Sequence, residues 1–117
     1  YPTINNANKA AYPVSGTCSE NGETVNLSVG GVTATPVCAA LAWSATLDVT
    51  ALVDSASVTI TANHQDVAGN NAPTATRSVL KDTLDPTVTI TSSPVINSLN
   101  QAAYTVSGTC SENTRSV

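Results

Sequence analysis

Apolar and polar residues alternate along most of this chain with a period of two, the pattern of half-buried strands. The clearest example is 25–29, where three apolar residues alternate with Asn and Ser. The same alternation covers 12–18, 43–49 and 58–62. Each stretch therefore predicts a strand with one face toward a core.

Weaker strand patterns occupy residues 32–38, 74–81 and 87–91. Pro36 interrupts the first of these, and proline is tolerated mainly on edge strands, so we expect 32–38 at a sheet edge. The turn residues between the stretches are Gly, Asn and Asp, and no helical pattern exceeds about one turn. The sequence predicts an all-β protein, an antiparallel β-sandwich of about seven strands.

The alternation also predicts which side chains form the core. Trp43 begins an apolar face, which favours core packing over the alternative of an exposed surface for stacking sugars. The residues expected in the core are Val14, Leu27, Trp43, Leu47 and Ile60.

One stretch of the sequence occurs twice. Residues 10–21 return at 102–113 with a single difference, and Ala10 and Ala102 are 92 positions apart. Such a match indicates a tandem-repeat unit of about 92 residues, the size of a whole small β-domain. We expect one repeat at 1–85 and the first strand, loop and second strand of the next repeat at 86–117.

This division leaves the first repeat without its own first strand, because the strand at 87–91 belongs to the next repeat. Two explanations stay open. The chain is a fragment of a longer array with arbitrary ends, or residues 86–117 pack into a neighbouring molecule by strand addition.

The chain has three cysteines, and the repeat accounts for the odd number. Cys110 matches Cys18 and lies before any counterpart of Cys38, so it would pair outside the repeat or remain free. A Cys18–Cys38 disulfide is the simplest interpretation, and it predicts an oxidising, extracellular or periplasmic setting. Two free thiols in a cytosolic protein are the alternative.

Charge and hydropathy exclude two classes of partner. Four Lys and Arg are scattered along a chain with a net charge of −4, which gives no basic surface for nucleic acid. No apolar run approaches the roughly 18 residues that a membrane-spanning helix needs.

Six motifs follow one another along the chain, at 14–20, 25–29, 43–49, 58–63, 66–70 and 82–90. Together they resemble the bacterial Ig-like repeats of large secreted adhesins and surface proteins. The resemblance implies an Ig-like sandwich, display on the bacterial cell surface, and a role as a spacer or adhesive stalk. The cysteine pair resembles a subset of these repeats with one disulfide.

Acidic residues near the repeat junction suggest a calcium site. Asp66 and Asn70 in one turn, with Asp82 and Asp85 in the linker, offer the oxygen ligands that Ca²⁺ prefers. Some members of the resembled family stiffen their junctions in this way. The alternative is that these residues are ordinary turn formers bonded to their own backbone.

No set of residues predicts catalysis, so we expect a protein that is not an enzyme. His64 is the only histidine and follows the 58–62 alternation, which favours a structural or solvent-facing role. A Cys18–His64 nucleophile–base pair would need a free thiolate. Lys9 and Lys81 fall in polar segments, which disfavours an isopeptide cross-link.

The predicted function is a non-catalytic structural or adhesive repeat of a bacterial extracellular stalk, adhesin or surface filament. Its partners would be other copies of itself, joined covalently in tandem or by strand exchange, with a host or cell-surface ligand as a further possibility. The alternative is a carbohydrate- or receptor-binding module, for which three Tyr and one Trp offer few exposed aromatics.

Overall fold

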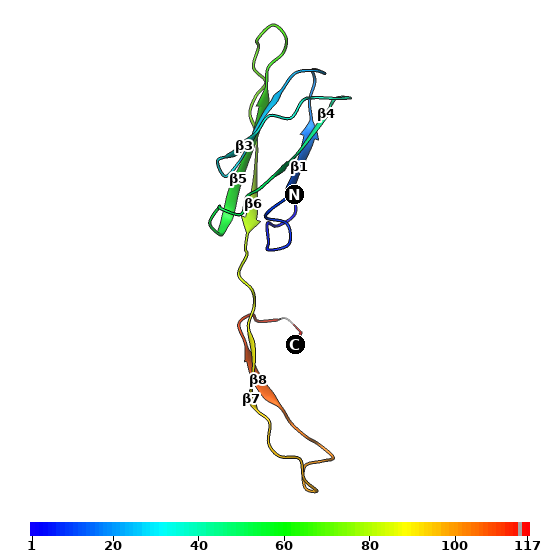
Figure 1. The fold of residues 1–117 in the computed structure, drawn as a ribbon, viewed down its shortest axis with the longest axis vertical. Coiled ribbons are helices and arrows are strands. Elements are labelled where there is room, and N and C mark those ends of the chain that lie inside the picture. The colour runs from blue at the N-terminus through cyan, green and yellow to red at the C-terminus, as the bar shows by residue number, and fades with distance from the viewer. Residues whose placement is uncertain (115) are drawn as a thin grey trace. The chain divides into compact units, whose positions relative to one another are not determined.

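The computed structural model describes residues 1–114 and 116–117, which divide into two compact units, Tyr1–Thr83 and Leu84–Val117 (Figure 1). The regular elements of both units are strands, in agreement with the predicted all-β class. In chain order they are β1 (Tyr12–Thr17), β2 (Val25–Val29), β3 (Val32–Ala34), β4 (Ala42–Leu47), β5 (Ser55–His64), β6 (Ala75–Lys81), β7 (Val88–Ser92) and β8 (Ser107–Cys110).

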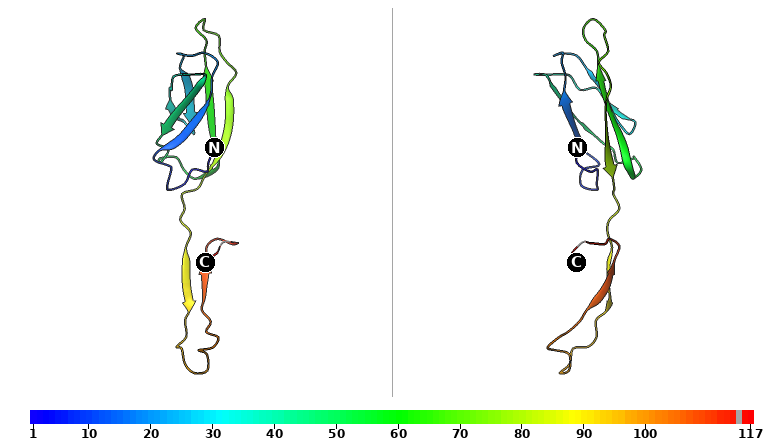
Figure 2. Two further views of the ribbon diagram at one scale, coloured as in Figure 1. Left: turned by 90° about the vertical axis from the view of Figure 1, so that its right-hand side faces the viewer. Right: turned by 180° about the vertical axis from the view of Figure 1, so that it is seen from behind.

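The first unit contains two antiparallel sheets, consistent with a β-sandwich (Figure 2). One sheet has the order β3-β2-β5-β6, and the other consists of β1 and β4. Strand β3 lies at an edge, as predicted, and ends before Pro36, because a proline has no N–H for the ladder.

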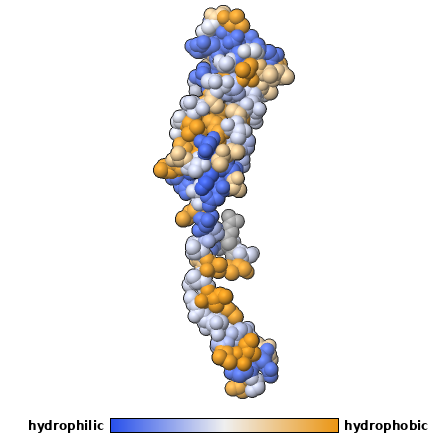
Figure 3. All heavy atoms as spheres, viewed as in Figure 1, coloured by the Kyte–Doolittle hydropathy of each residue, from blue (hydrophilic) through white to orange (hydrophobic). Residues whose placement is uncertain are grey.

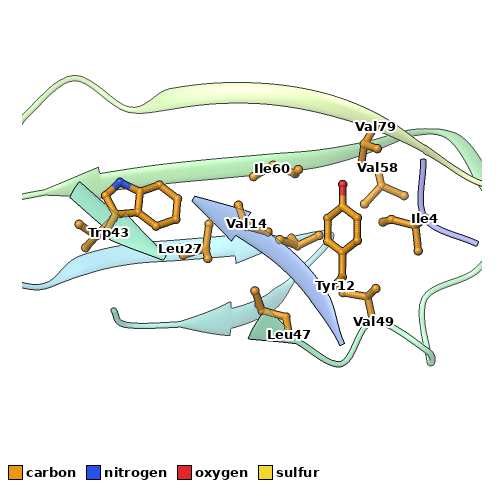
Figure 4. Packing of buried hydrophobic residues seen from close by; sticks show 12 residues of the cluster. Ile4, Tyr12, Val14, Leu27, Trp43, Leu47, Val49, Val58, Ile60 and Val79 are labelled. Atoms are coloured by element: carbon orange, nitrogen blue, oxygen red, sulfur yellow. The ribbon is translucent and has the colours of Figure 1, made fainter. Parts of the chain in front are cut away.

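The core lies between these two sheets and is built from the inward residue of each alternation. The five residues expected in the core from the sequence are all buried. Figure 4 shows Trp43 at one end of the cluster and Ile4 at the other, with Val14, Leu27 and Ile60 between them. Each fully buried aliphatic side chain contributes roughly 1.5–3 kcal/mol, so a thin core of Val, Ile and Leu supports the unit.

Ile4 belongs to the core although it lies in an Asn-rich segment with no apolar alternation. Its side chain is 0% exposed, and its backbone forms a parallel bridge with Lys81. Ile4 N donates to Leu80 O at 2.9 Å, and Asp82 N donates to Ile4 O at 2.9 Å. The N-terminal segment is therefore fastened alongside the end of β6.

The second unit is a pair of antiparallel strands, β7 and β8, with no second sheet among its described residues. Both strands are exposed along their whole length. Ile96, which matches Ile4 in the repeated sequence, is 62% exposed here. Figure 3 shows apolar residues on the visible surface of this unit. Ile96 and Val106, which match the core residues Ile4 and Val14 of the first unit, are thus exposed here.

The Asn-rich turn has the same hydrogen bonds in both units. Asn5 N donates to Asn8 Oδ1 at 2.9 Å, and Asn97 N donates to Asn100 Oδ1 at 2.8 Å. In each turn the Asn side chain takes the place of a backbone partner, as Asx turns do. The matching sequences therefore adopt the same local structure 92 positions apart.

A tyrosine anchors the preceding chain in both units. The Tyr12 hydroxyl donates to Pro2 O at 2.8 Å. The Tyr104 hydroxyl makes the same bond to Pro94 O. In the first unit the Tyr12 ring is completely buried, and this burial raises the pKa of its hydroxyl above the ordinary value. The bond therefore satisfies a phenol that the core would otherwise leave without water.

Candidate functional site

A disulfide joins Cys18 to Cys38, as the sequence predicted. Cys18 directly follows β1, whereas Cys38 is paired with the chain leading into β2: Cys38 N donates to Glu23 O at 2.8 Å, and Gly22 N donates to Cys38 O at 2.9 Å. The bridge therefore links the two sheets covalently. Cys110 is exposed and free in the described part of the chain.

An open cavity of about 590 Å³ lies beside this disulfide. It is located where the end of β1 faces the C-terminal half of β5 and the first residues of β6. Its walls combine apolar side chains with polar groups. They include Gly16, Cys18, Trp43, Ile60, Ala62 and Arg77.

Trp43 forms the inner wall of the cavity and packs against β1. Its indole Nε1 donates to Thr17 O at 3.2 Å, and its side chain is 8% exposed. A Cβ placed on Gly16 would lie 2.7 Å from Trp43 Cζ2, so only glycine admits the ring at this position. Trp43 is a core residue with one side toward the cavity, and it does not form an exposed stacking surface.

The edge of β1 along the cavity carries no partner strand among the described residues. Cys18 N donates to Leu41 O of the β4 side at 3.1 Å, so the backbone groups of Thr17 and Ser15 point away from β4. Two side chains cover the carbonyls on this edge. The Tyr1 hydroxyl donates to Ser15 O at 2.6 Å, and Thr17 O accepts the indole N–H of Trp43.

His64 lies in the cavity wall and is buried. Its Nε2 is 3.2 Å from Ser19 Oγ, while its Nδ1 is buried with no hydrogen-bond partner. This geometry fits the structural role expected from the sequence. Because Cys18 is part of the disulfide, it offers His64 no thiol to activate.

The four candidate calcium ligands do not form one set in this chain. Asp66 and Asn70 lie in the turn that precedes β6, Asp82 follows the far end of β6, and Asp85 belongs to the second unit. Both carboxylate oxygens of Asp66 already accept hydrogen bonds from Asn70, at 2.8 Å each. These bonds lower the pKa of the Asp66 carboxyl. No group of three or more acidic, His or Cys side chains suited to a metal ion occurs in the described residues.

Lys81 was expected in a polar loop, and this expectation is wrong. It is the last residue of β6. Its side chain is 3% exposed because it points to the same inward face of the strand as Val79, two positions earlier. Its Nζ donates to Leu52 O at 2.5 Å and lies 3.4 Å from Asp54 Oδ1. A backbone hydrogen bond from Thr83 is the main reason that the pKa of Asp54 is lowered. The inward alternation of Val79 and Lys81 was the available signal in the sequence.

Comparison with known proteins gives no match: no protein-family model, no curated protein and no solved structure is significantly similar to this chain. Among the described residues, no helix is long and apolar enough to cross a lipid bilayer. The candidate site lies in the first unit. It consists of an open cavity beside an unpartnered strand edge, fixed by a disulfide between two sheets.

Proposed function

We propose that this chain is a non-catalytic structural module of an extracellular tandem array, a stalk, adhesin or surface filament made of Ig-like sandwiches. The observation that carries the proposal is the recurrence, 92 positions apart, of one sequence with the same turn hydrogen bonds. A second opening of the same fold within one chain is what an array of domains requires.

The strand order supports an Ig-like topology. An edge strand, two central strands and a further edge strand form one sheet, and two strands form the other. Ig-type sandwiches likewise divide their antiparallel strands between two facing sheets. The disulfide differs from the antibody pattern, because it joins the end of β1 to the segment after β3.

A mechanical role fits the way the ends of the first unit are fastened. Ile4 runs parallel to the end of β6. Tension applied at the two ends of this unit pulls parallel neighbours in opposite directions, which shears their hydrogen bonds instead of opening them one by one. The disulfide closes a segment with a sequence separation of 20 residues, which tension cannot extend.

Single-molecule force spectroscopy of the full chain tests this role. We expect the first unit to unfold in one discrete rupture. Under reducing conditions the released length should increase by about 70 Å, because 20 residues contribute up to about 3.6 Å each. The variant Cys18→Ala with Cys38→Ala should give the longer release without reductant. Gradual extension with no discrete rupture would contradict the proposal.

A further inference from the structure

We propose that the edge of β1 and the cavity beside it accept a strand with the sequence of β7, supplied by another copy of the repeat. The inference rests on the proposed array, since it names the contact through which two copies join. It belongs to the class of strand addition, in which backbone bonds give affinity and side-chain pockets give specificity.

The second unit supplies the template for this contact. Strand β8 has the sequence Ser-Gly-Thr-Cys, which is identical to residues 15–18 at the edge of β1. Strand β7 pairs with β8 in an antiparallel register, so the same register can be transferred to β1. The transferred pairs are Val88 opposite Cys18, Thr89 opposite Thr17, and Ile90 opposite Gly16.

This register turns the apolar side of β7 toward the cavity. Directly opposed residues of an antiparallel pair point to the same face, and the Thr89 and Thr109 hydroxyls are 2.7 Å apart. Thr17, the counterpart of Thr109, is exposed. The neighbouring residues of β7, Val88 and Ile90, therefore point inward, beside Gly16 and Trp43.

The exposed fractions show what the donated strand gains. Val88 is 63% exposed and Ile90 is 72% exposed in the second unit, whose described residues form no second sheet. The cavity of about 590 Å³ has room for both side chains, and Trp43, Ile60 and Ala62 in its wall provide apolar contacts. Burial of these two side chains drives the association.

The backbone of β1 is also ready for the strand. Thr17 and Ser15 direct their backbone groups to the open edge, as their counterparts in β8 do toward β7. The donated strand would displace the Tyr1 hydroxyl from Ser15 O and the Trp43 indole N–H from Thr17 O. In the second unit the Thr89 carbonyl occupies the place where a Cβ of Gly108 would stand. At Gly16 the corresponding place is covered by the Trp43 ring, whose Cζ2 would lie 2.7 Å from a Cβ, so this ring would have to turn aside for an incoming backbone.

Peptide binding to the full chain tests the acceptor site. The probe is a fluorescent peptide of residues 85–92, and the chain carries Cys110→Ser to prevent disulfide exchange. We expect saturable binding by anisotropy. A peptide with Ile90→Asp should bind at least tenfold more weakly. A peptide with Thr89→Asp, which carries the same charge on the outward face, should lose no more than about threefold in affinity. Absence of binding, or equal loss with both peptides, overturns the proposal.

Disulfide trapping tests the register. A Thr17→Cys acceptor is mixed with a Thr89→Cys donor, both carrying Cys110→Ser, and cross-links are located by peptide mapping. We expect a heterodimer from this pair and at least tenfold less from a Ser15→Cys acceptor with the same donor. Equal cross-linking of both acceptors overturns the register.

The two proposals fail separately. If the peptide and the cysteine pair both give negative results while the force rupture persists, the acceptor site is wrong and the structural module stands. If the peptide binds but the rupture is absent, the proposed mechanical function is wrong and the acceptor site stands.

Discussion

Removal of the disulfide should weaken the first unit by a large and calculable amount. The change is Cys18→Ala together with Cys38→Ala, in a chain that already carries Cys110→Ser. The bridge closes a loop with a sequence separation of 20 residues. The loop-entropy model then gives about 3 kcal/mol of lost stability at 25 °C.

This loss is large relative to the whole. A unit of the size of Tyr1–Thr83 has an expected free energy of unfolding of roughly 4–12 kcal/mol. The substitution also removes the buried sulfur of Cys38, which is 1% exposed, so the entropic figure is a lower bound. The unit should remain folded at 25 °C with a much smaller margin.

Urea unfolding, followed by the fluorescence of the single tryptophan, measures the effect. With a slope of about 1 kcal/mol per molar urea, the midpoint should fall by about 3 M. The Cys110→Ser chain with an intact bridge is the matched control and should resemble the original chain, because Cys110 is exposed. A fall of less than about 0.5 M would refute the reasoning, since the bridge would then constrain little of the unfolded chain.

Four further outcomes are expected. In urea titrations, Lys81→Met should change the free energy of unfolding by less than about 1 kcal/mol or raise it, because the Met side chain fills the buried space without a buried charge. Lys81→Ala should lower the free energy of unfolding by about 2 kcal/mol or more, because it leaves a cavity. Because the folded-state pKa of Asp54 lies below its ordinary value of 3.8, its stabilising contribution is present above that value and is lost as the pH falls through the folded pKa. Asp54→Asn should therefore flatten the acid limb of a melting-temperature profile below about pH 4, and an unchanged profile would contradict this. Ala40 and Leu41 have positive φ angles of 52° and 62°, which cost residues with a side chain more than glycine. Leu41→Gly should therefore raise the melting temperature by a few degrees in calorimetry, and a decrease would show that the turn is not strained. Millimolar calcium should not shift the melting temperature relative to EDTA, because both oxygens of Asp66 are occupied, and a shift of several degrees would argue for a bound ion.

Strands with clear alternation could be predicted from the sequence because each has one buried face. The pattern at 25–29 gives β2 with its inward residues. Ile4 could not be predicted in this way, since a single apolar residue among asparagines has no period. Its burial depends on Lys81, 77 positions later in the chain, and only the folded sheet brings the two together.

Turn chemistry and the site were harder to predict. Ala40 and Leu41 occupy left-handed backbone positions that usually favour Gly or Asn, so composition gives no sign of the turn. Asn21 supplies the support instead, because its Oδ1 accepts the N–H of Leu41 at 2.8 Å. The disulfide could be predicted by counting cysteines in the repeat. The cavity could not, since it depends on how β1 faces β5 and β6.

The matching Asn turns have a consequence for how such an array would fold. The turn around Asn97 has its hydrogen bonds in a unit without a covered core, so local contacts alone specify it. Neighbouring copies would then form the same turn early in folding, and the strands that follow these turns could be exchanged between copies. Identical segments in adjacent domains favour domain-swapped misfolding, in which one copy captures the strand of the next. Sequence divergence between neighbouring copies at β1 would protect against such misfolding. The two copies at 10–21 and 102–113 differ at one position, where the first has Pro13 and the second has Thr105.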